Sequence, residues 1–412
     1  MASTKLKLGM IGLGQRGFGL LNTLVLFDNV QIVALSDCYQ DRIDRANKVI
    51  TEKGGKAAKG YPDYRGLLAD QEVQAVIVAS SWETHADIAI ACLVAKKITA
   101  LEVGGALSVE DCWKLVDTVE STGTPFMFLE NCCYDKQELM ITNMVRHGLF
   151  GEIVYCSGAY SHDLRDEILG GNINRHYRLN NYLHRNCENY PTHQLGPIAK
   201  ILNINRGNRM VSLVSVASKS AGLRSYIRRN KDKVDERVHD ATFRQGDIVN
   251  TIITCSDGAT ILLTLDTTLP TVYDRQLLIK GTEGMFNQSN NYAVLDSDEK
   301  GEEHWTGIEN SMAHINSAVK YEEEYLPDFW KNITDQDRET GHGGMDGFIL
   351  HAFVDCALNG KDMPIDVYDA ASWMSITALS EQSIALGNMP VAIPDFTRGK
   401  WMSRKSKDVI DF

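Results

Sequence analysis

Residues Leu6–Asp37 read LKLGMIGLGQRGFGLLNTLVLFDNVQIVALSD, and this stretch decides how the N-terminal part of the chain folds. A short apolar run leads into three glycines with the spacing Gly-x-Gly-x-x-Gly, and an amphipathic segment and a second apolar run follow. Short apolar runs are typical of buried strands, and amphipathic periodicity indicates a helix between them. The stretch therefore predicts a strand, a tight turn, a helix and a second strand.

The three glycines have separate roles in such a turn. Gly12 permits the turn, Gly14 lets backbone N–H groups approach a pyrophosphate, and Gly17 lets the helix pack closely on the strand. Asp37 follows Gly17 by 20 residues, where a carboxylate accepts hydrogen bonds from an adenosine ribose and repels a 2′-phosphate. Such turns also occur as plain strand–helix connections, but the flanking strands and the acid favour binding of NAD, rather than NADP.

Length and composition bound the class of protein. With 412 residues, 43% of them hydrophobic and 23% charged, the chain is expected to form a globular protein with two domains. Its net charge of −12 argues against a nucleic acid or an anionic membrane as partner, since both require a basic surface. No apolar run approaches the roughly 18 residues that cross a bilayer.

The cysteine pattern and the first residues of the sequence bear on the cellular compartment in which the protein is expected. Nine cysteines without a repeated spacing do not indicate a disulfide framework, and no Cys-x-x-Cys pair offers a zinc site. The adjacent Cys132 and Cys133 are best explained as small buried hydrophobes. The start, MASTKLKLGMIGLG, contains no signal peptide. We expect a cytoplasmic protein from the sequence as given, and a periplasmic one if an export leader was removed.

An alternation of strands and helices continues to about residue 130. Further strands are predicted over 73–79, 98–103 and 125–129, with helices over 39–53, 85–93 and 109–121. This alternation is typical of a doubly wound parallel sheet, which holds its ligand at the carboxyl ends of the strands. We therefore expect an α/β protein whose residues 1–130 form an NAD-binding Rossmann domain.

The pattern changes after residue 130. Period-2 strands are predicted over 153–160, 211–217, 247–255, 259–265 and 276–281, with helical patterns over 139–147 and 344–386. Strands without intervening helices favour an open, mainly antiparallel sheet, so residues 131–412 are expected to form an α+β domain. An uncovered face of such a sheet would need a partner, which predicts a homo-oligomer, a dimer or higher.

Polar residues gather at the predicted strand ends and in the loops that follow them. They are Glu102, Glu130–Asn131, Tyr160–Arg165, Arg175–Arg178, Tyr190–His193, Tyr273 and Gly341–Asp346. Four of the eleven histidines lie between residues 162 and 193. Imidazole titrates near neutrality and a phenol can donate a proton or be stabilised as phenolate, so these residue types suit proton transfer on sugar hydroxyls.

Two interpretations of the segment around Pro191 stay open. Tyr190 and His193 share one face if Pro191 occupies the first turn of a helix, a position that proline favours. Equally, Pro191 starts a helix and His193 packs in the core. No HExxH or carboxylate-rich spacing accompanies the histidines, so no metal site is expected.

Other candidates also have plain structural explanations. His85 precedes a helix and is more often a capping or packing histidine. Glu102 and Glu130 at strand ends are as readily surface carboxylates as site residues. The glycines of Gly341–Gly344 fit a flexible turn before a helix equally well.

The N-terminal half resembles the glucose–fructose oxidoreductase and inositol dehydrogenase (Gfo/Idh/MocA) superfamily. The shared features are the glycine turn, Asp37, THADIAIACL at 84–93 and a strand that ends in Glu102. Most members have Glu-Lys-Pro where this chain has Glu102-Val103-Gly104, and their lysine assists hydride transfer. Their Asp-x-x-x-His is replaced by Tyr190-Pro-Thr-His193. The missing lysine counts against an ordinary NAD(P)-dependent sugar dehydrogenase, which is the alternative function.

These departures match one branch of the superfamily. The matching motifs are ENCCY (130–134), VRHGLFGEIV (145–154), GAYSHDLR (158–165), HYRL (176–179), NYPTHQLGP (189–197), INRGNR (204–209), a tyrosine after TTLP (267–270) and GHGGMD (341–346). With them, nearly the whole chain resembles glycoside hydrolase family 109, which comprises NAD-dependent glycosidases typified by α-N-acetylgalactosaminidase. Many members are exported behind a twin-arginine leader, which this sequence lacks.

The resemblance implies a set of site residues and a partner. The implied catalytic residues are Tyr160, His162, Tyr190 and His193, and those implied to bind the sugar are Glu130, Arg178 and Tyr273. The implied cofactor-binding residues are Gly12, Leu13, Gly14, Gln15, Arg16, Gly17, Asp37, Ser80, His85, Glu102 and Asn131. The partner is a small glycoside or a glycan-terminal sugar, cleaved by oxidation, elimination, water addition and reduction with tightly bound NAD. A sugar sensor without catalysis is disfavoured by the His/Tyr cluster.

Overall fold

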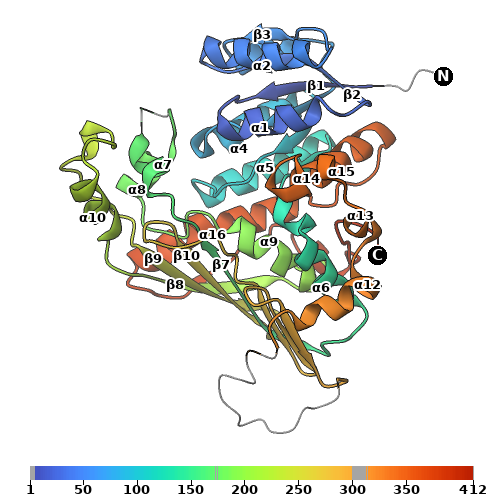
Figure 1. Cartoon of the computed structure of the whole chain (residues 1–412), viewed down its shortest axis with the longest axis vertical. Helices are drawn as coiled ribbons and strands as arrows, with labels where there is room; N and C mark the ends of the chain where they lie inside the picture. Colours follow the sequence, from blue (N-terminus) through green and yellow to red (C-terminus); the bar gives the residue numbers. More distant parts are fainter. Residues whose placement is uncertain (1–4, 172, 174, 299–311, 313, 412) are drawn as a thin grey trace. The chain divides into compact units, whose positions relative to one another are not determined.

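The computed structural model describes residues 5–171, 173, 175–298, 312 and 314–411 (Figure 1). The chain forms two compact units. The first contains the chain up to Tyr134 together with Asn332–Ala371 and Asp408–Asp411, and the second contains Asp135–Lys331 and Ser372–Lys407. The expected domains, 1–130 and 131–412, stay a prediction, and the compact units differ from them because chain beyond residue 331 packs with the N-terminal part.

The first unit contains a six-stranded parallel sheet with the order β3-β2-β1-β4-β5-β6. Its strands are β1 (Leu6–Ile11), β2 (Val30–Ser36), β3 (Lys59–Tyr61), β4 (Ala75–Val78), β5 (Ile98–Leu101) and β6 (Phe126–Phe128). The strand order reverses between β1 and β4, which is the switch point where doubly wound sheets bind ligands. The predicted parallel Rossmann sheet is confirmed.

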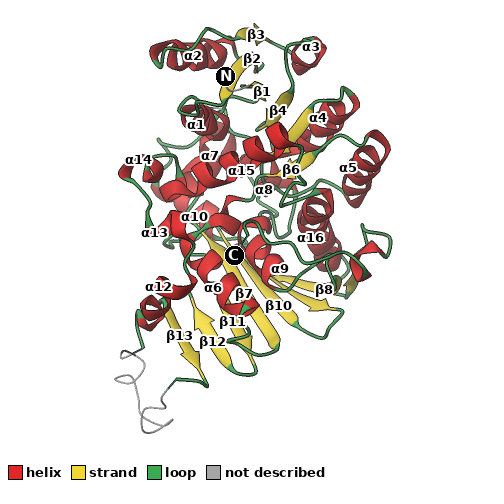
Figure 2. Cartoon of the chain, turned by 90° about the vertical axis from the view of Figure 1, so that its right-hand side faces the viewer, coloured by secondary structure: helices red, strands yellow, loops and turns green. Residues whose placement is uncertain are grey.

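Helices cover both faces of this sheet. They are α1 (Gln15–Leu24), α2 (Gln40–Glu52), α3 (Tyr64–Ala69), α4 (Trp82–Val94) and α5 (Val109–Thr122), with α14 (Asp335–Arg338), α15 (Met345–Asn359), η1 (Asn131–Tyr134) and η4 (His342–Gly344) in the same unit. Figure 2 shows α1 and α2 on one side of the strands and α4 and α5 on the other. Every residue of β4 is buried, as a strand covered on both faces requires.

The second unit contains an eight-stranded sheet with the order β13-β12-β11-β7-β10-β9-β8-β14. Its strands are β7 (Ile153–Ser161), β8 (Met210–Ala217), β9 (Ile248–Cys255), β10 (Thr260–Asp266), β11 (Leu278–Gly281), β12 (Gly284–Asn287), β13 (Tyr292–Leu295) and β14 (Val391–Ala392). Among the pairs of described strands in this second sheet, only β7–β10 is parallel. The predicted mainly antiparallel sheet is confirmed, and β12, β13 and β14 are additional to the prediction.

Helices lie on one face of this second sheet (Figure 2). The helices of the unit are α6 (Lys136–Arg146), α7 (Arg165–Gly170), α8 (Arg178–His184), α9 (Thr192–Ile201), α10 (Gly222–Arg229), α12 (Glu322–Tyr325), α13 (Asp328–Lys331), η2 (Glu236–Val238), η3 (Ser317–Tyr321), η5 (Lys400–Met402) and most of α16 (Val367–Ala385). Helix α9 packs on β7, where a Cβ at Gly158 would lie only 2.8 Å from Cβ of Gln194. The glycine therefore permits the close approach of helix and strand.

The other sheet face carries apolar side chains that remain accessible. Ile252 is 53% exposed, Val216 48% and Val294 40%. Their neighbours in the strands, such as Ile253, point to the opposite face and are buried. Among the described residues, then, this sheet is covered on one face only.

The tail differs from its prediction in one respect. The helical pattern expected over 344–386 forms two helices, because α15 ends at Asn359 with Gly360, whose φ of 63° is left-handed, as its C-cap, and Pro364 lies before α16 begins. Within the described part of the chain, the search for a bilayer-spanning helix finds none with the required length and apolarity.

Candidate active site

The glycine turn between β1 and α1 has the geometry that a pyrophosphate requires. Gly12 has a φ of 88°, and a Cβ there would lie 2.5 Å from the carbonyl oxygen of Ala79. A Cβ at Gly17 would lie 2.0 Å from the carbonyl oxygen of Gly12, so α1 can approach only without a side chain. Gly14 is the N-cap residue of α1, and a Cβ built on it would have Nη1 of Arg42, at 3.6 Å, as its nearest neighbour. The backbone N–H groups at the helix start are therefore approachable by an anion.

Asp37 stands at the end of β2, beside this turn. Its Oδ2 accepts a hydrogen bond from the N–H of Leu13 at 2.7 Å, and its Oδ1 accepts one from the N–H of Tyr39 at 2.9 Å. These bonds fix the carboxylate next to the glycine turn and leave further lone pairs for a ligand. The arrangement fits the ribose diol of NAD.

Arg16, in the first turn of α1, is held by two carboxylates. Its Nε donates to Oε1 of Glu102 at 2.9 Å, and its Nη2 donates to Oδ1 of Asp346 at 3.0 Å. Asp346 also accepts from Nδ2 of Asn131 at 2.8 Å, and its Oδ2 lies 2.9 Å from Nδ1 of His342. Burial alone would raise the pKa of Asp346, but Arg16 and His342 hold that pKa well below its usual range. The structure thus brings together Arg16, Glu102 and Asn131 with the GHGGMD motif.

The chain after Glu102 explains the departure from Glu-Lys-Pro. The lysine position is occupied by Val103, which is buried and has no ammonium group. A Cβ at Gly104 would lie 2.4 Å from Cδ1 of Trp82, so the indole occupies the volume that a side chain at this position would need. The first unit is therefore built without the lysine that assists hydride transfer in the resembling dehydrogenases.

Ser80 and His85 lie after β4. Nε2 of His85 is 3.0 Å from the carbonyl oxygen of Ser80, and burial lowers the pKa of His85 to about 4. The imidazole is therefore neutral near pH 7 and fixes the loop between β4 and α4. Contact of Ser80 and His85 with the cofactor stays a prediction.

The second unit brings five of the predicted sugar-site rings together. Tyr160, at the end of β7, has its hydroxyl 3.1 Å from Nδ1 of His162, and its ring centroid is 4.6 Å from that of Tyr190. The hydroxyl of Tyr190 lies 3.4 Å from Nε2 of His193, in the first turn of α9. The ring of Tyr273 stands edge-on to that of His162, with centroids 5.2 Å apart. We call these five residues the aromatic cluster.

Pro191 lies between Tyr190 and His193, at the start of the helix that carries His193. It is the N-cap residue of α9 and has a helical φ of −71°, so the helix begins directly after it. The expected helix start at Pro191 is confirmed, and His193 is both buried and in contact with the ring of Tyr190.

Arg178 adds a cation to the aromatic cluster. Its Cζ lies 5.2 Å from the ring centroid of Tyr190, and its Nε lies 2.6 Å from Oε1 of Glu167 on α7. Burial lowers the pKa of His162, and the positive charge of Arg178 lowers it further. His162 is therefore neutral near pH 7, as a group that accepts a proton must be.

Sequence reasoning missed a buried ion cluster beside Tyr273. Arg275 donates through Nε and Nη2 to Oε1 of Glu138 at 2.9 and 2.6 Å, and through Nη1 to the hydroxyl of Tyr273 at 3.3 Å. Burial raises the pKa of Glu138, as does the neighbouring carboxylate of Asp135, against the pull of Arg275. A guanidinium only donates, so the Tyr273 oxygen accepts here and its own proton points elsewhere. The two-residue spacing from Tyr273 was the one available signal.

Glu188 is a second residue that the sequence did not single out. Its side chain is fully buried, and Oε1 accepts a hydrogen bond from the N–H of Tyr190 at 3.3 Å. Burial raises the pKa of Glu188 to about 8. It lies directly before the NYPTHQLGP motif, which was its only signal.

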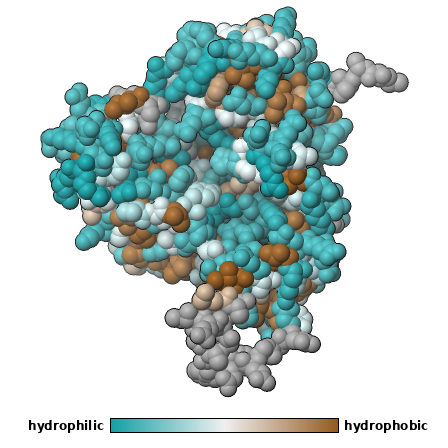
Figure 3. Space-filling model, in the orientation of Figure 1, coloured by the Kyte–Doolittle hydropathy of each residue, from teal (hydrophilic) through white to brown (hydrophobic). Residues whose placement is uncertain are grey.

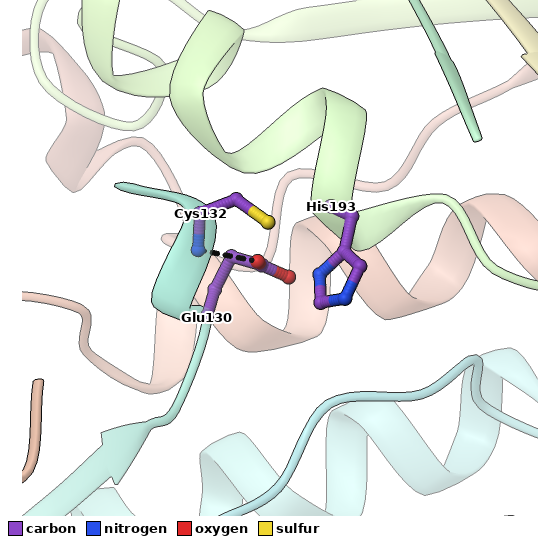
Figure 4. A group of neighbouring side chains, drawn as sticks. All are labelled: Glu130, Cys132 and His193. Atoms are coloured by element: carbon purple, nitrogen blue, oxygen red, sulfur yellow. Dashed lines mark hydrogen bonds between the residues drawn. The ribbon is translucent and has the colours of Figure 1, made fainter. Parts of the chain in front are cut away.

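Glu130 belongs to the first unit, whereas the aromatic cluster belongs to the second. Figure 4 shows it at the end of β6, with its Oε1 accepting a hydrogen bond from the N–H of Cys132 at 3.1 Å, and shows His193 at the start of α9. Binding of the sugar by Glu130 stays a prediction.

Two family models match the chain. Residues 6–129 match the oxidoreductase family with an NAD-binding Rossmann fold, and residues 134–403 match the C-terminal domain of glycosyl hydrolase 109. A glycosyl hydrolase family 109 protein of Stenotrophomonas maltophilia (strain K279a) is 37% identical over 97% of this chain and 91% of its own length. An α-N-acetylgalactosaminidase of Shewanella oneidensis is 36% identical over 98% of this chain and 88% of its own length.

Solved structures share the fold at low identity. A levoglucosan dehydrogenase in complex with NADH and levoglucosan has a TM-score of 0.70 at 18% identity, covering 95% of this chain and 100% of its own. A myo-inositol dehydrogenase from Lactobacillus casei, in complex with NAD(H) and myo-inositol, has a TM-score of 0.63 at 16% identity, covering 95% and 99%. These likenesses concern the fold alone.

The fold and the glycine turn define an enzyme that uses NAD, built on the Gfo/Idh/MocA plan. A narrower class follows from the family model that matches residues 134–403 and from the relatives that cover nearly the full length of the chain. The chain belongs to glycosyl hydrolase family 109. It is a glycosidase that uses NAD.

Proposed function

We propose that the enzyme removes N-acetylgalactosamine or a closely related sugar from glycosides. The support comes from the relatives in Shewanella oneidensis and Tannerella forsythia, both called α-N-acetylgalactosaminidase, at 36% and 34% identity. Elimination through C2 does not require one fixed geometry at C1, so both anomers belong in a substrate screen.

The observation that carries the proposed chemistry is the aromatic cluster. Ordinary glycosidases act with a pair of carboxylic acids that flank the scissile bond. Here the groups that converge are phenols and imidazoles, which suit proton removal from carbon and from hydroxyl groups. When bound, NAD supplies reversible acceptance of the hydride at C3.

The residues then act on protons around the sugar ring. A ketone at C3 makes the C2 proton acidic, and loss of that proton expels the group at C1. Tyr160 takes the C2 proton, and Tyr190 with His193 takes and returns the proton of the C3 hydroxyl. His162 receives the hydroxyl proton of Tyr160, 3.1 Å from its Nδ1, gives this proton to the leaving group, and then takes one from the water that adds at C1. Hydride and protons return to C3, O3 and C2, so the net change is hydrolysis.

Binding roles complete the assignment. Arg178 and Glu130 orient the sugar through hydrogen bonds. Tyr273, whose oxygen accepts from Arg275, directs its own proton to a sugar oxygen. The glycine turn and Asp37 hold the dinucleotide.

One experiment tests the function. The purified protein is denatured and analysed for released NAD, and the native protein is offered nitrophenyl α- and β-glycosides, including N-acetylgalactosaminides, without added cofactor. We expect hydrolysis without net formation of reduced cofactor. Reduced cofactor released in proportion to substrate would instead identify a sugar dehydrogenase. Hydrolysis that persists undiminished in protein stripped of nucleotide would refute the mechanism.

A second experiment tests the base at C2. In Tyr160→Phe we expect solvent deuterium exchange at C2 to stop while bound NAD is still reduced by substrate. The matched variant Tyr155→Phe, on the same strand, should keep both steps. Loss of both steps in Tyr160→Phe would contradict the assignment.

We also propose that the protein forms a homo-oligomer through the uncovered face of the second sheet. The register places Val214, Ile252 and Leu262 side by side on that face. A contiguous apolar surface of this kind is stabilised by a partner that excludes water. Light scattering should give a dimer or larger, Ile252→Glu should dissociate it, and the control Val94→Glu should not. A monomeric wild type would contradict the proposal.

A further inference from the structure

Helix α10 and the residues after it carry an exposed group of cations. The group consists of Arg224, Arg228, Arg229, Lys231 and Lys233, with Asp232 as the only acid in that stretch. We call these five residues the α10 basic surface. In the space-filling view of Figure 3, the left-hand region where Figure 1 places α10 is mostly hydrophilic. The chain as a whole has a net charge of −12, so this surface has the opposite sign to its host.

Among the described residues, no carboxylate forms an ion pair within 4 Å with any of these cations, although Asp163 and Asp166 lie near Tyr226 on the same helix. Nη1 of Arg224 donates to the carbonyl oxygen of Ala241 at 3.3 Å, and Nε of Arg229 donates to that of Ser225 at 3.2 Å. The nearby Arg237, by contrast, pairs with Asp235 at 2.6 Å. Arg224 and Arg228 stand four positions apart on the helix, a spacing at which like charges repel. The arrangement disfavours the helix, so an external anion would relieve it.

Helix α10, which carries three of these cations, contacts through Tyr226 the segment that follows the aromatic cluster. The Cζ of Arg165 lies 4.9 Å from the ring centroid of Tyr226 on α10. Arg165 also binds Asp163, the residue directly after His162, with Nε 2.7 Å from Oδ1. One chain of contacts within the second unit therefore links the cations to the end of β7.

We infer that the α10 basic surface binds carboxylated sugars of the same glycan whose terminal sugar is cleaved. This inference rests on the proposed function and names a substrate class for it, namely acidic glycans. Guanidinium groups match carboxylates through two parallel hydrogen bonds, and exposed cations beside a site raise the rate of encounter with an anionic ligand. A nucleic acid is disfavoured because the remaining surface is acidic.

The test compares Arg228→Glu/Arg229→Glu with the wild type and with Lys53→Glu/Lys56→Glu, which changes net charge equally at two exposed lysines of the first unit. Substrates are a glycopeptide that carries terminal N-acetylgalactosamine and sialic acid, the same glycopeptide after removal of sialic acid, and a neutral nitrophenyl glycoside. For the wild type we expect kcat/KM about tenfold higher on the sialylated form at low salt, with the preference lost at high salt. Arg228→Glu/Arg229→Glu should lose the preference and keep its activity on the nitrophenyl glycoside.

Three outcomes would overturn the inference. The first is that Arg228→Glu/Arg229→Glu keeps the preference for the sialylated glycopeptide. The second is that Lys53→Glu/Lys56→Glu loses this preference to the same extent. The third is that the wild type binds RNA or phosphatidylserine vesicles as well as it binds the sialylated glycopeptide. Binding of the immobilised sialylated glycopeptide is measured separately, without turnover. If no glycoside is hydrolysed but this binding depends on Arg228 and Arg229, the proposed function fails and the anion surface stands.

Discussion

Asp346 pairs with Arg16 through both of its carboxylate oxygens, at 2.5 and 3.0 Å, although the two residues are 330 positions apart in the chain. The pair joins the helix that follows the glycine turn to the start of α15, and Asn131 binds the same carboxylate. Burial would lower the pKa of Arg16, yet Glu102 and Asp346 raise it above its usual value, so the cation is permanent. A motif near the C-terminus thus fixes the geometry of the N-terminal turn.

Replacing Asp346 by Asn should weaken cofactor retention. The amide cannot neutralise Arg16, which keeps only Glu102, so we expect the free energy of unfolding to fall by about 3 kcal/mol, the low end of the range for a broken buried ion pair. NAD content after extensive dialysis and the urea midpoint should both fall. The control Glu339→Gln, an exposed carboxylate in the same segment, should change neither. Full NAD content in Asp346→Asn would contradict this role.

The contribution of Glu188 to stability should fall as the pH rises. Its pKa is about 8 when folded and close to the ordinary value when unfolded, so the folded protein holds a proton that the unfolded chain has released between these pH values. The contribution of Glu188 to stability is therefore full below about pH 4 and declines until about pH 8, by on the order of 3–5 kcal/mol. Urea unfolding should show Glu188→Gln more stable than the wild type at pH 8 and equal at pH 4. A constant difference across this range, or the same behaviour in the exposed control Glu152→Gln, would refute the prediction.

The charge of Arg178 should be readable in the titration of His162. Because the guanidinium lowers the pKa of the imidazole, Arg178→Gln should raise that pKa, and Arg178→Lys should leave it nearly unchanged. The imidazole resonances followed by NMR give the pKa directly. Where activity is measurable, the acid limb of the kcat/KM profile should move to higher pH in Arg178→Gln. A shift of equal size in Arg178→Lys would show that packing, and not charge, is responsible.

Gly104 should tolerate a methyl group only when Trp82 is smaller. The predicted cost of Gly104→Ala is about 1–3 kcal/mol, as for other overpacked sites, and most of it should vanish in a Trp82→Ala background. Unfolding free energies of the four proteins measure the coupling. Gly19→Ala, where a Cβ meets nothing within 4 Å, should be neutral or stabilising. An additive double variant would mean that the indole does not set the preference for glycine.

The regular parts of the fold could be predicted from the sequence. Period-2 strands and buried apolar runs report local burial, so β1, β4, β7, β9 and β10 were found within a few residues of their observed ends. The short helices α7, α8 and α10 were not, because each has fewer than three turns and depends on tertiary contacts. The strands β12 and β13 are four residues each, too short for a period to emerge.

The candidate site divides in the same way. The place of His193 in the first turn of a helix was predictable because Pro191 marks where α9 begins, whereas Tyr190 lies just before the helix and meets His193 through the turn that leads into it. The ion-pair partners of Arg16 and Arg275 were not predictable. Glu102 and Asp346 lie 86 and 330 positions from Arg16 in the chain, and Glu138 lies 137 positions from Arg275. No local pattern encodes a pairing at such a distance, although the residues themselves were visible in the sequence.

The N–H of Phe128 in β6 donates a hydrogen bond to the carbonyl oxygen of Ile365, and this long-range bond affects how the chain folds during biosynthesis. The edge of the nucleotide-binding sheet cannot be completed until the ribosome has made most of the 412 residues, and the partner of Arg16 emerges equally late. The first unit therefore stays incompletely folded while the second unit is synthesised. A nascent chain stalled before residue 332 should remain sensitive to protease around β6, and it should bind the dinucleotide only after the last eighty or so residues have been synthesised.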